Sequence, residues 1–312
     1  MNKVFKNSKN QVRSGWKIAG VMALYFLIVL VLQIISGIVA VIFMAGKVPM
    51  DKLAAAVTDY MTKSSVGMLI SQGLDFAALL IALILVIKVM EKKKFKDYGL
   101  TAVNRNYKDL VWGLLLGIVS MTIIFVILLA TKNIELQDSL LKPKFSGYTV
   151  SGLVLFIIVA FKEEFLSRGY SITVLNQMNR PWLSIVLSSI MFSAMHFLNP
   201  NVKVLGLVNI VLVGVLFGYM FVKTKNLWMP IGYHLTWNYF QGNIFGFAVS
   251  GTDPHGIYTI STVKDNILTG GAFGPEAGIL TTIVIVLGVL IVWRFHKSEQ
   301  FYEEKSNFHG MI

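Results

Sequence analysis

Long apolar runs constrain the fold of this 312-residue chain more than any other feature. A helix that crosses the hydrocarbon core of a bilayer needs about 20 apolar residues, and eight runs have roughly that length or come near it. They cover residues 18–45, 66–90, 110–130, 148–176, 182–197, 204–222, 227–249 and 278–293. With 55% hydrophobic and only 14% charged residues, the chain has more apolar surface than a soluble domain buries. We predict an all-α, polytopic transmembrane bundle of about eight helices.

The order of the runs and loops divides the chain into four parts. These are a basic leader (1–17), the first three helices (18–147), helices four to seven (148–250), and an outer loop with the eighth helix and a cytosolic tail (251–312). The first run is longer than the apolar core of a signal peptide, so we expect it to remain as a membrane helix. The fifth run is short and ends at Asn199-Pro200, which predicts a helix that stops inside the protein.

The distribution of positive charge predicts the orientation in the membrane. Eight crossings place both termini on one side. If that side is the cytosol, 20 of the 28 Lys and Arg residues lie inside and 8 outside, as expected for cytoplasmic loops rich in these residues. The net charge of +12 is then explained by topology and by contact with the anionic lipid bilayer. We therefore expect no nucleic-acid partner, and the sequence contains no nucleic-acid-binding motif.

Small and polar residues inside the apolar runs predict helix contacts. Two motifs, Gly113-Leu-Leu-Leu-Gly117 and Gly214-Val-Leu-Phe-Gly218, have the spacing that lets two membrane helices approach closely. Gln72 and Asp75 lie within the second run, and we expect them to find hydrogen-bond partners inside the protein.

Two adjacent acids and a base interrupt the fourth run, at Glu163, Glu164 and Arg168. A carboxylate at membrane depth costs about 2.5–3.5 kcal/mol even on lenient insertion scales. The acids could simply mark a helix end, but the helical pattern continues to about residue 176. Arg168 follows Glu164 by four residues and can neutralise it. Glu163, about 100° further round the helix, is then free to face another group.

Two later helices carry His196, and His234 with Asn238. The latter two are four residues apart, so they share one helix face. If the fourth and fifth helices form a hairpin that turns near Asn179, Glu163 lies 16 residues before the turn and His196 lies 17 after it. Both are then about 25 Å from the turn. A simple count places His234 less deep, so a common site requires the hairpin turn to protrude into the cytosol.

A glutamate, two histidines and an asparagine can hydrolyse an amide. A carboxylate in a poorly solvated cavity can take a proton from water, and N–H donors from histidine and asparagine can stabilise the resulting oxyanion. The chain has no cysteine and no serine nucleophile motif, so we favour direct attack by water without a cofactor. The alternative is zinc held by Glu163, His196 and His234, although no His-Glu-x-x-His helix is present.

Glu-Glu-x-x-x-Arg, Phe-x-x-x-His and His-x-x-x-Asn, in this order and each in its own apolar run, resemble the CPBP (Abi) family of intramembrane proteases. This family includes the type II CAAX prenyl endopeptidases, and the resemblance covers about residues 151–250. It implies that Glu163 and His196 activate water and that His234 and Asn238 form the oxyanion site. Glu164 and Arg168 are implied to be supporting residues.

The resemblance also implies a membrane-associated peptide or protein as substrate. Eukaryotic members trim prenylated carboxy termini, whereas bacterial relatives are linked to bacteriocin self-immunity and to processing of peptide signals or membrane proteins. The short loops and the Lys-rich, cysteine-free composition favour the bacterial plasma membrane and disfavour a prenylated substrate. The competing class is a non-enzymatic immunity or scaffold protein that binds a peptide toxin or membrane sensor. A transporter is disfavoured because no internal repeat is evident.

Overall fold

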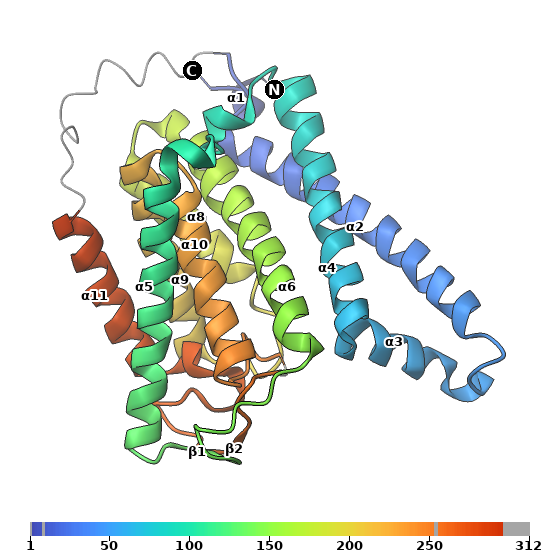
Figure 1. The fold of residues 1–312 in the computed structure, drawn as a ribbon. Coiled ribbons are helices and arrows are strands. Elements are labelled where there is room, and N and C mark those ends of the chain that lie inside the picture. The colour runs from blue at the N-terminus through green and yellow to red at the C-terminus, as the bar shows by residue number, and fades with distance from the viewer. Residues whose placement is uncertain (1, 8–9, 253–254, 296–312) are drawn as a thin grey trace.

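The computed structural model describes residues 2–7, 10–252 and 255–295, and these are mostly helical (Figure 1). In chain order the elements are α1 (Asn2–Phe5), α2 (Ser14–Met44), α3 (Leu53–Lys63), α4 (Ser65–Leu83), α5 (Val103–Ala130), β1 (Ile134–Leu136), α6 (Gly147–Glu164), α7 (Thr173–Leu175), α8 (Pro181–Ala194), α9 (Val204–Thr224), α10 (Trp228–Tyr239), β2 (Ile260–Val263) and α11 (Ile279–Phe295). Helices α4, α6 and α10 continue as π-helical segments over Ile84–Met90, Phe165–Ile172 and Phe240–Ile244.

The structure confirms apolar membrane helices but does not confirm the predicted number of eight crossings. In chain order, the eight apolar runs coincide with α2, α4, α5, α6, α8, α9, α10 and α11, and the fourth run also contains the short α7. Within the described residues, four helical segments are long and apolar enough to cross a membrane, namely Ser14–Met44, Ser65–Met90, Phe95–Ala130 and Val204–Thr224. Pro181–Ala194 and Ile279–Arg294 are apolar but shorter. Eight crossings therefore remain a prediction.

Three elements, α3, β1 and β2, lie in segments that were expected to be loops. Helix α3 is a short helix between α2 and α4, and β1 pairs with β2 in an antiparallel sheet that joins Ile134 to Val263. Both strands are only three or four residues long, which is too short for a clear alternating pattern. The predicted cytosolic tail, residues 296–312, and parts of the basic leader lie outside the described residues.

Local sequence signals explain where several helices begin. The Ser64 hydroxyl accepts a hydrogen bond from the Gly67 N–H at the start of α4 (3.0 Å), which satisfies one of the free amide groups of the first turn. The Ser146 N–H donates to the Thr149 hydroxyl at the start of α6 (3.2 Å). Helix α8 starts with Pro181, whose missing N–H is tolerated at the first helical position.

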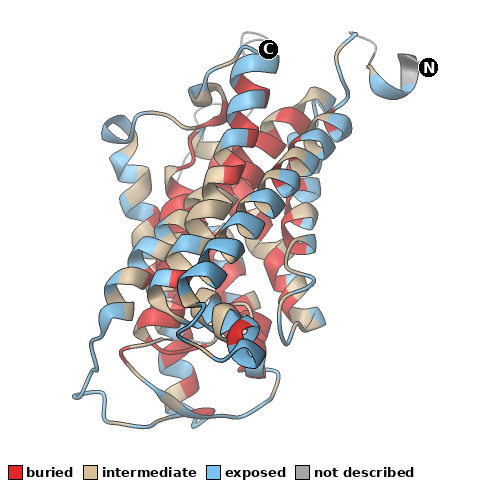
Figure 2. Ribbon diagram, turned by 90° about the vertical axis from the view of Figure 1, so that its right-hand side faces the viewer, coloured by how far each residue is buried: buried red, intermediate tan, exposed pale blue. Residues whose placement is uncertain are grey.

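Helix α6 lies between α4 and α10, so it occupies the middle of the bundle (Figure 1). Buried residues line the facing sides of the central helices, whereas exposed residues cover the outer sides (Figure 2). Helix α2 is exposed along almost its whole length, and its buried residues are Ser14, Val21 and Tyr25. An apolar helix exposed in this way is suited to contact lipid rather than water.

The first glycine motif packs α5 against α10. A Cβ at Gly113 would overlap the carbonyl oxygen of Met229, and one at Gly117 would overlap the Thr236 hydroxyl. The second motif packs α9 against α8, where a Cβ at Gly214 would lie 2.8 Å from that of Ser189. The predicted close packing is therefore present at both motifs. The partner helices α10 and α8 are the ones that lead to the two histidines.

We expect Gly117→Ala to lower the thermal unfolding midpoint of the detergent-solubilised protein. The added methyl group cannot fit without moving α10 away from α5, and such overpacking destabilises by about 1–3 kcal/mol. Gly73→Ala in α4 is the matched control, because a Cβ there meets nothing within 4 Å. Removing a helical glycine should leave stability unchanged or raise it by about 0.5–1 kcal/mol. Equal midpoints for the two variants would contradict this packing role.

The cysteine-free sequence allows a direct test of orientation by single cysteines. Lys94 is exposed in the connection between α4 and α5, and Leu141 is 90% exposed in the connection between β1 and α6. These two connections lie at opposite ends of the bundle (Figure 1). In intact cells, a membrane-impermeant maleimide should label Leu141→Cys, and should label Lys94→Cys only after lysis. The reverse pattern would contradict the charge-based topology.

Candidate active site

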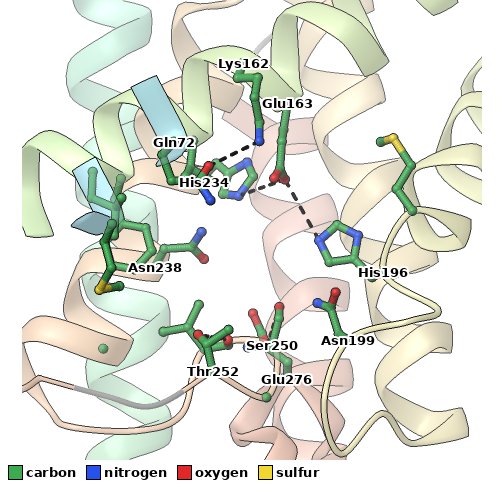
Figure 3. A pocket seen from close by; sticks show the side chains of 18 of the residues that line it. Gln72, Lys162, Glu163, His196, Asn199, His234, Asn238, Ser250, Thr252 and Glu276 are labelled. Carbon is green, nitrogen blue, oxygen red and sulfur yellow. Dashed lines mark hydrogen bonds and ion pairs between the residues drawn. The ribbon is translucent and has the colours of Figure 1, made fainter. Parts of the chain in front are cut away.

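A cavity of about 1150 Å³ opens between α4, α6, α10 and the loops that follow α8 and α10. Glu163, His196, His234 and Asn238 all line it, and Figure 3 shows their side chains directed into the same space. The structure thus brings together the four residues that the sequence analysis singled out as catalytic candidates.

Glu163 stands at the centre of this group, near the end of α6. Its Oε2 atom lies 3.9 Å from Nε2 of His196 and 3.8 Å from Nε2 of His234. These separations are too long for direct hydrogen bonds but suit a small bridging group such as water. Oε2 is buried and forms no hydrogen bond with the described residues. Such a group needs an explanation in a native site.

His196 lies in the turn that follows α8 and not in the helix, contrary to the expected helical position. Helix α8 ends at Ala194, after which the His196 N–H donates to the Ser193 carbonyl (3.0 Å). Pro200 follows closely and cannot donate to a helix ladder. The ring still meets the residue four positions earlier, since the Phe192 and His196 rings are 4.8 Å apart. Phe192 and His196 are therefore in contact, as on a helix, although the helix ends before His196.

His234 reaches the same depth as Glu163. The Leu227 side chain is among the groups nearest to Gly169, so Gly169 and Leu227 lie at the same depth in the bundle. Glu163 lies six residues before Gly169, and His234 lies seven after Leu227. The chain from residue 170 to the turn near Asn179 therefore extends beyond the start of α10. The hairpin turn therefore protrudes as a common site requires. The count of residues that placed His234 less deep than Glu163 is wrong.

Both imidazole rings are oriented through Nδ1. Nδ1 of His234 lies 2.8 Å from Oε1 of Glu164, and Nδ1 of His196 lies 2.9 Å from the Phe192 carbonyl oxygen. Since both partners are acceptors, these contacts assign the proton to Nδ1 in each neutral ring. Each Nε2 then presents a lone pair. Three acceptor atoms, two Nε2 and Oε2 of Glu163, consequently face one another and require a proton donor or a cation between them.

Arg168 is fully buried and contacts residues that support the site. Its Nη1 atom donates to Oε1 of Glu164 (3.0 Å), which confirms the predicted pair. Its guanidinium lies 4.2 Å from the centre of the Phe192 ring and 5.2 Å from that of Phe217, distances typical of cation–π contacts. Glu164 therefore binds both Arg168 and His234. The second contact joins separate helices, and no local sequence pattern predicts it.

A second polar cluster ties α6 to α2 and α4 beside Glu163. Lys162 forms an ion pair with Asp75, and its Nζ lies 3.4 Å from the Gln72 amide oxygen. The Tyr25 hydroxyl donates to the other Asp75 oxygen. Gln72 and Asp75 thus have the internal partners that were expected. Lys162 was not singled out, although its position next to Glu163 in an apolar helix was an available signal.

The donor set is partly suited to zinc. One carboxylate oxygen and two imidazole nitrogens converge. The other nitrogen of each ring, Nδ1, contacts an oxygen acceptor, as is usual for histidine ligands of metals. The separations of 3.8 and 3.9 Å exceed the roughly 3.3–3.5 Å between ligands at zinc bond lengths. Accordingly, the described part of the chain contains no His, Cys, Asp or Glu cluster already spaced for a metal ion. Zinc would require a contraction of about half an ångström.

A family model described as type II CAAX prenyl endopeptidase Rce1-like matches residues 143–240. This segment contains both glutamates, Arg168, both histidines and Asn238. The resemblance to the CPBP family is confirmed. The match and the apolar helices support an integral membrane protein and, in general terms, an intramembrane protease of the CAAX type. Comparison with curated proteins finds no match.

We expect Arg168→Ala to reduce the amount of folded protein in membranes. The substitution leaves Glu164 as a buried carboxylate without its arginine, and breaking a buried pair in this way costs about 3–5 kcal/mol. Abundance and the thermal midpoint should both fall, whereas Arg105→Ala at an exposed position of α5 should change neither. If Arg168→Ala accumulates normally and only loses activity, Arg168 belongs to the reaction of the CPBP-type site and not to its support.

Proposed function

We propose that the chain is an intramembrane endopeptidase that hydrolyses a peptide bond of a membrane-associated peptide or protein. The observation that carries this proposal is the convergence of Glu163, His196 and His234 at 3.8–3.9 Å on the wall of one cavity. The match to the endopeptidase family over the same residues supports it. The site lies among apolar helices, so its substrate must enter a membrane-embedded cavity.

Glu163 and His196 activate the attacking water in this proposal. A water molecule between Oε2 of Glu163 and Nε2 of His196 can donate its protons to these two acceptors. Glu163 takes one proton as the water oxygen attacks the carbonyl carbon of the scissile bond. The same proton then passes to the amide nitrogen, the carbon–nitrogen bond breaks, and the nitrogen leaves as an amine. The other product is a carboxylic acid.

His234 and Asn238 stabilise the oxyanion of the tetrahedral intermediate. Asn238 lies one helical turn after His234, and its amide is directed into the cavity (Figure 3). His234 donates through Nε2 when its ring has taken up a second proton from solvent before the attack, and the Glu164 carboxylate at Nδ1 stabilises that positive charge. Glu164 therefore supports the oxyanion site through His234. A single oxyanion donor is worth about 10²–10³ in turnover where it has been measured.

Zinc is the alternative way to place a positive group among the three acceptors. Glu163, His196 and His234 would hold the ion, with Glu164 and the Phe192 carbonyl fixing the two rings. Bound zinc would lower the pKa of a ligated water to about 7. In both versions Glu163 and His196 are essential, and Asn238 acts on the substrate and not on the metal.

The proposed activity is tested on the purified protein in detergent. Cleavage of membrane peptides is measured for wild type, Glu163→Gln, His196→Ala and Asn238→Ala, with and without chelator, together with bound zinc. In the metal-free version Glu163→Gln abolishes cleavage, chelator has no direct effect and no stoichiometric zinc is present. In the zinc version either histidine or Glu163 substitution releases the metal. Asn238→Ala should slow turnover by about 10²–10³ without changing zinc content.

The same variants separate an enzyme from a scaffold. A non-enzymatic immunity or scaffold protein tolerates Glu163→Gln in its biological assay, because the amide keeps the size of the side chain. A protease loses its function with this substitution while the thermal midpoint stays near that of wild type. Cleavage that survives both Glu163→Gln and His196→Ala would remove these residues from the mechanism.

A further inference from the structure

A second carboxylate, Glu276, lines the same cavity on the wall opposite Glu163 (Figure 3). It lies in a short 3₁₀ turn, Pro275–Ala277, outside the matched family segment and outside the helices that can cross the membrane. Its residue is only 9% exposed. Neither the proposed hydrolysis nor any sequence motif uses this side chain.

The turn that carries Glu276 is anchored by side chains of α9 and α11. The Asn209 amide donates to the carbonyl oxygens of Glu276 (2.7 Å) and Gly278 (3.0 Å). The Thr281 hydroxyl donates to the Pro275 carbonyl (2.6 Å). These bonds hold the backbone of the turn independently of the Glu276 side chain. The hydrogen-bonded turn therefore fixes the position of the carboxylate at the wall of the cavity.

The Glu276 carboxylate has hydrogen bonds but no cationic partner. Its Oε2 atom accepts from the N–H of Ser250 (2.6 Å) and from the Ser250 hydroxyl (2.9 Å). Among the described residues, no Lys or Arg side chain forms an ion pair with it. Burial raises the pKa of the Glu276 carboxyl, while the Ser250 hydrogen bonds act in the opposite direction. A buried carboxylate in this state is stabilised by any cation that enters the cavity.

Glu276 is also close to the reacting groups. His196, Asn199 and Ser250 line the same cavity as Glu276 (Figure 3). A peptide advances at most about 3.3–3.6 Å per residue. A substrate whose scissile bond lies at Glu163 and His196 therefore brings a nearby side chain to Glu276.

We infer that Glu276 forms a subsite for a basic side chain, Lys or Arg, of the peptide substrate, close to the scissile bond. The subsite rests on the proposed peptidase activity and adds a specificity to it. Oε2 is held by Ser250, and the charge of the carboxylate is available to an ammonium or guanidinium group. Glu276 is thus a specificity-determining residue and takes no part in proton transfer to the scissile amide.

The test compares matched peptides that contain arginine or its neutral isostere citrulline at each position around a cleaved bond. With wild-type protein, kcat/KM should favour arginine by about tenfold to a hundredfold at one position, the range for a hydrogen-bonded charged contact. Glu276→Gln should abolish this preference, and Glu276→Lys should replace it by a preference for glutamate. The matched control Glu135→Gln, at an exposed site in β1, should retain the arginine preference.

Binding separates failure of the subsite from failure of the peptidase. The same fluorescent peptide pairs are titrated onto the Glu163→Gln variant, alone and combined with Glu276→Gln. Arginine peptides should bind more tightly only when Glu276 is present, whether or not any peptide is cleaved. Equal wild-type values for arginine and citrulline at every position overturn the subsite even if cleavage is fast. A preference that persists in Glu276→Gln overturns it as well.

Discussion

The carboxylate of Glu164 accepts hydrogen bonds from Arg168 on its own helical segment and from His234 on α10. This contact joins the two central helices at membrane depth, where an unpaired carboxylate would be strongly destabilising. It also fixes the tautomer of His234, so that Nε2 faces Glu163. The two adjacent acids therefore have different tasks: Glu164 binds Arg168 and His234 through Oε1 and orients the site, and Glu163 faces the cavity with Oε2 free of hydrogen bonds to the described residues.

Close helix packing makes this contact possible. Without side chains at Gly113 and Gly117, α5 lies directly against the backbone of α10, the helix of His234. Gly214 gives the same close approach between α9 and α8, the helix that leads to His196. A shift of α10 by about the width of a methyl group would break the 2.8 Å contact between His234 and Glu164. The small-residue motifs thus position the helices that carry or lead to the two histidines of the site.

The cavity combines an apolar surrounding with polar walls. Lys162, paired with Asp75, links α6 to α4 beside Glu163, while Glu276 faces Glu163 from the opposite side. Within a membrane, irregular backbone is tolerated only where protein or water covers it. The turns that bear His196 and Glu276 meet this condition, since both line the cavity. They place catalytic and recognition groups where a continuous helix could not.

Composition and periodicity alone determined the helical membrane class, the positions of the apolar helices, the Glu164–Arg168 pair and the residues of the candidate site. Those signals are local, because they depend on run length and on spacing of four residues along a helix. Only the tertiary structure decided that His234 reaches the depth of Glu163, that Glu164 joins α10, and that Glu276 enters the cavity. These contacts join segments distant in the sequence, and their geometry depends on how far the α6–α8 hairpin extends past α10. No periodicity records that distance, because it is set by the packing of whole helices.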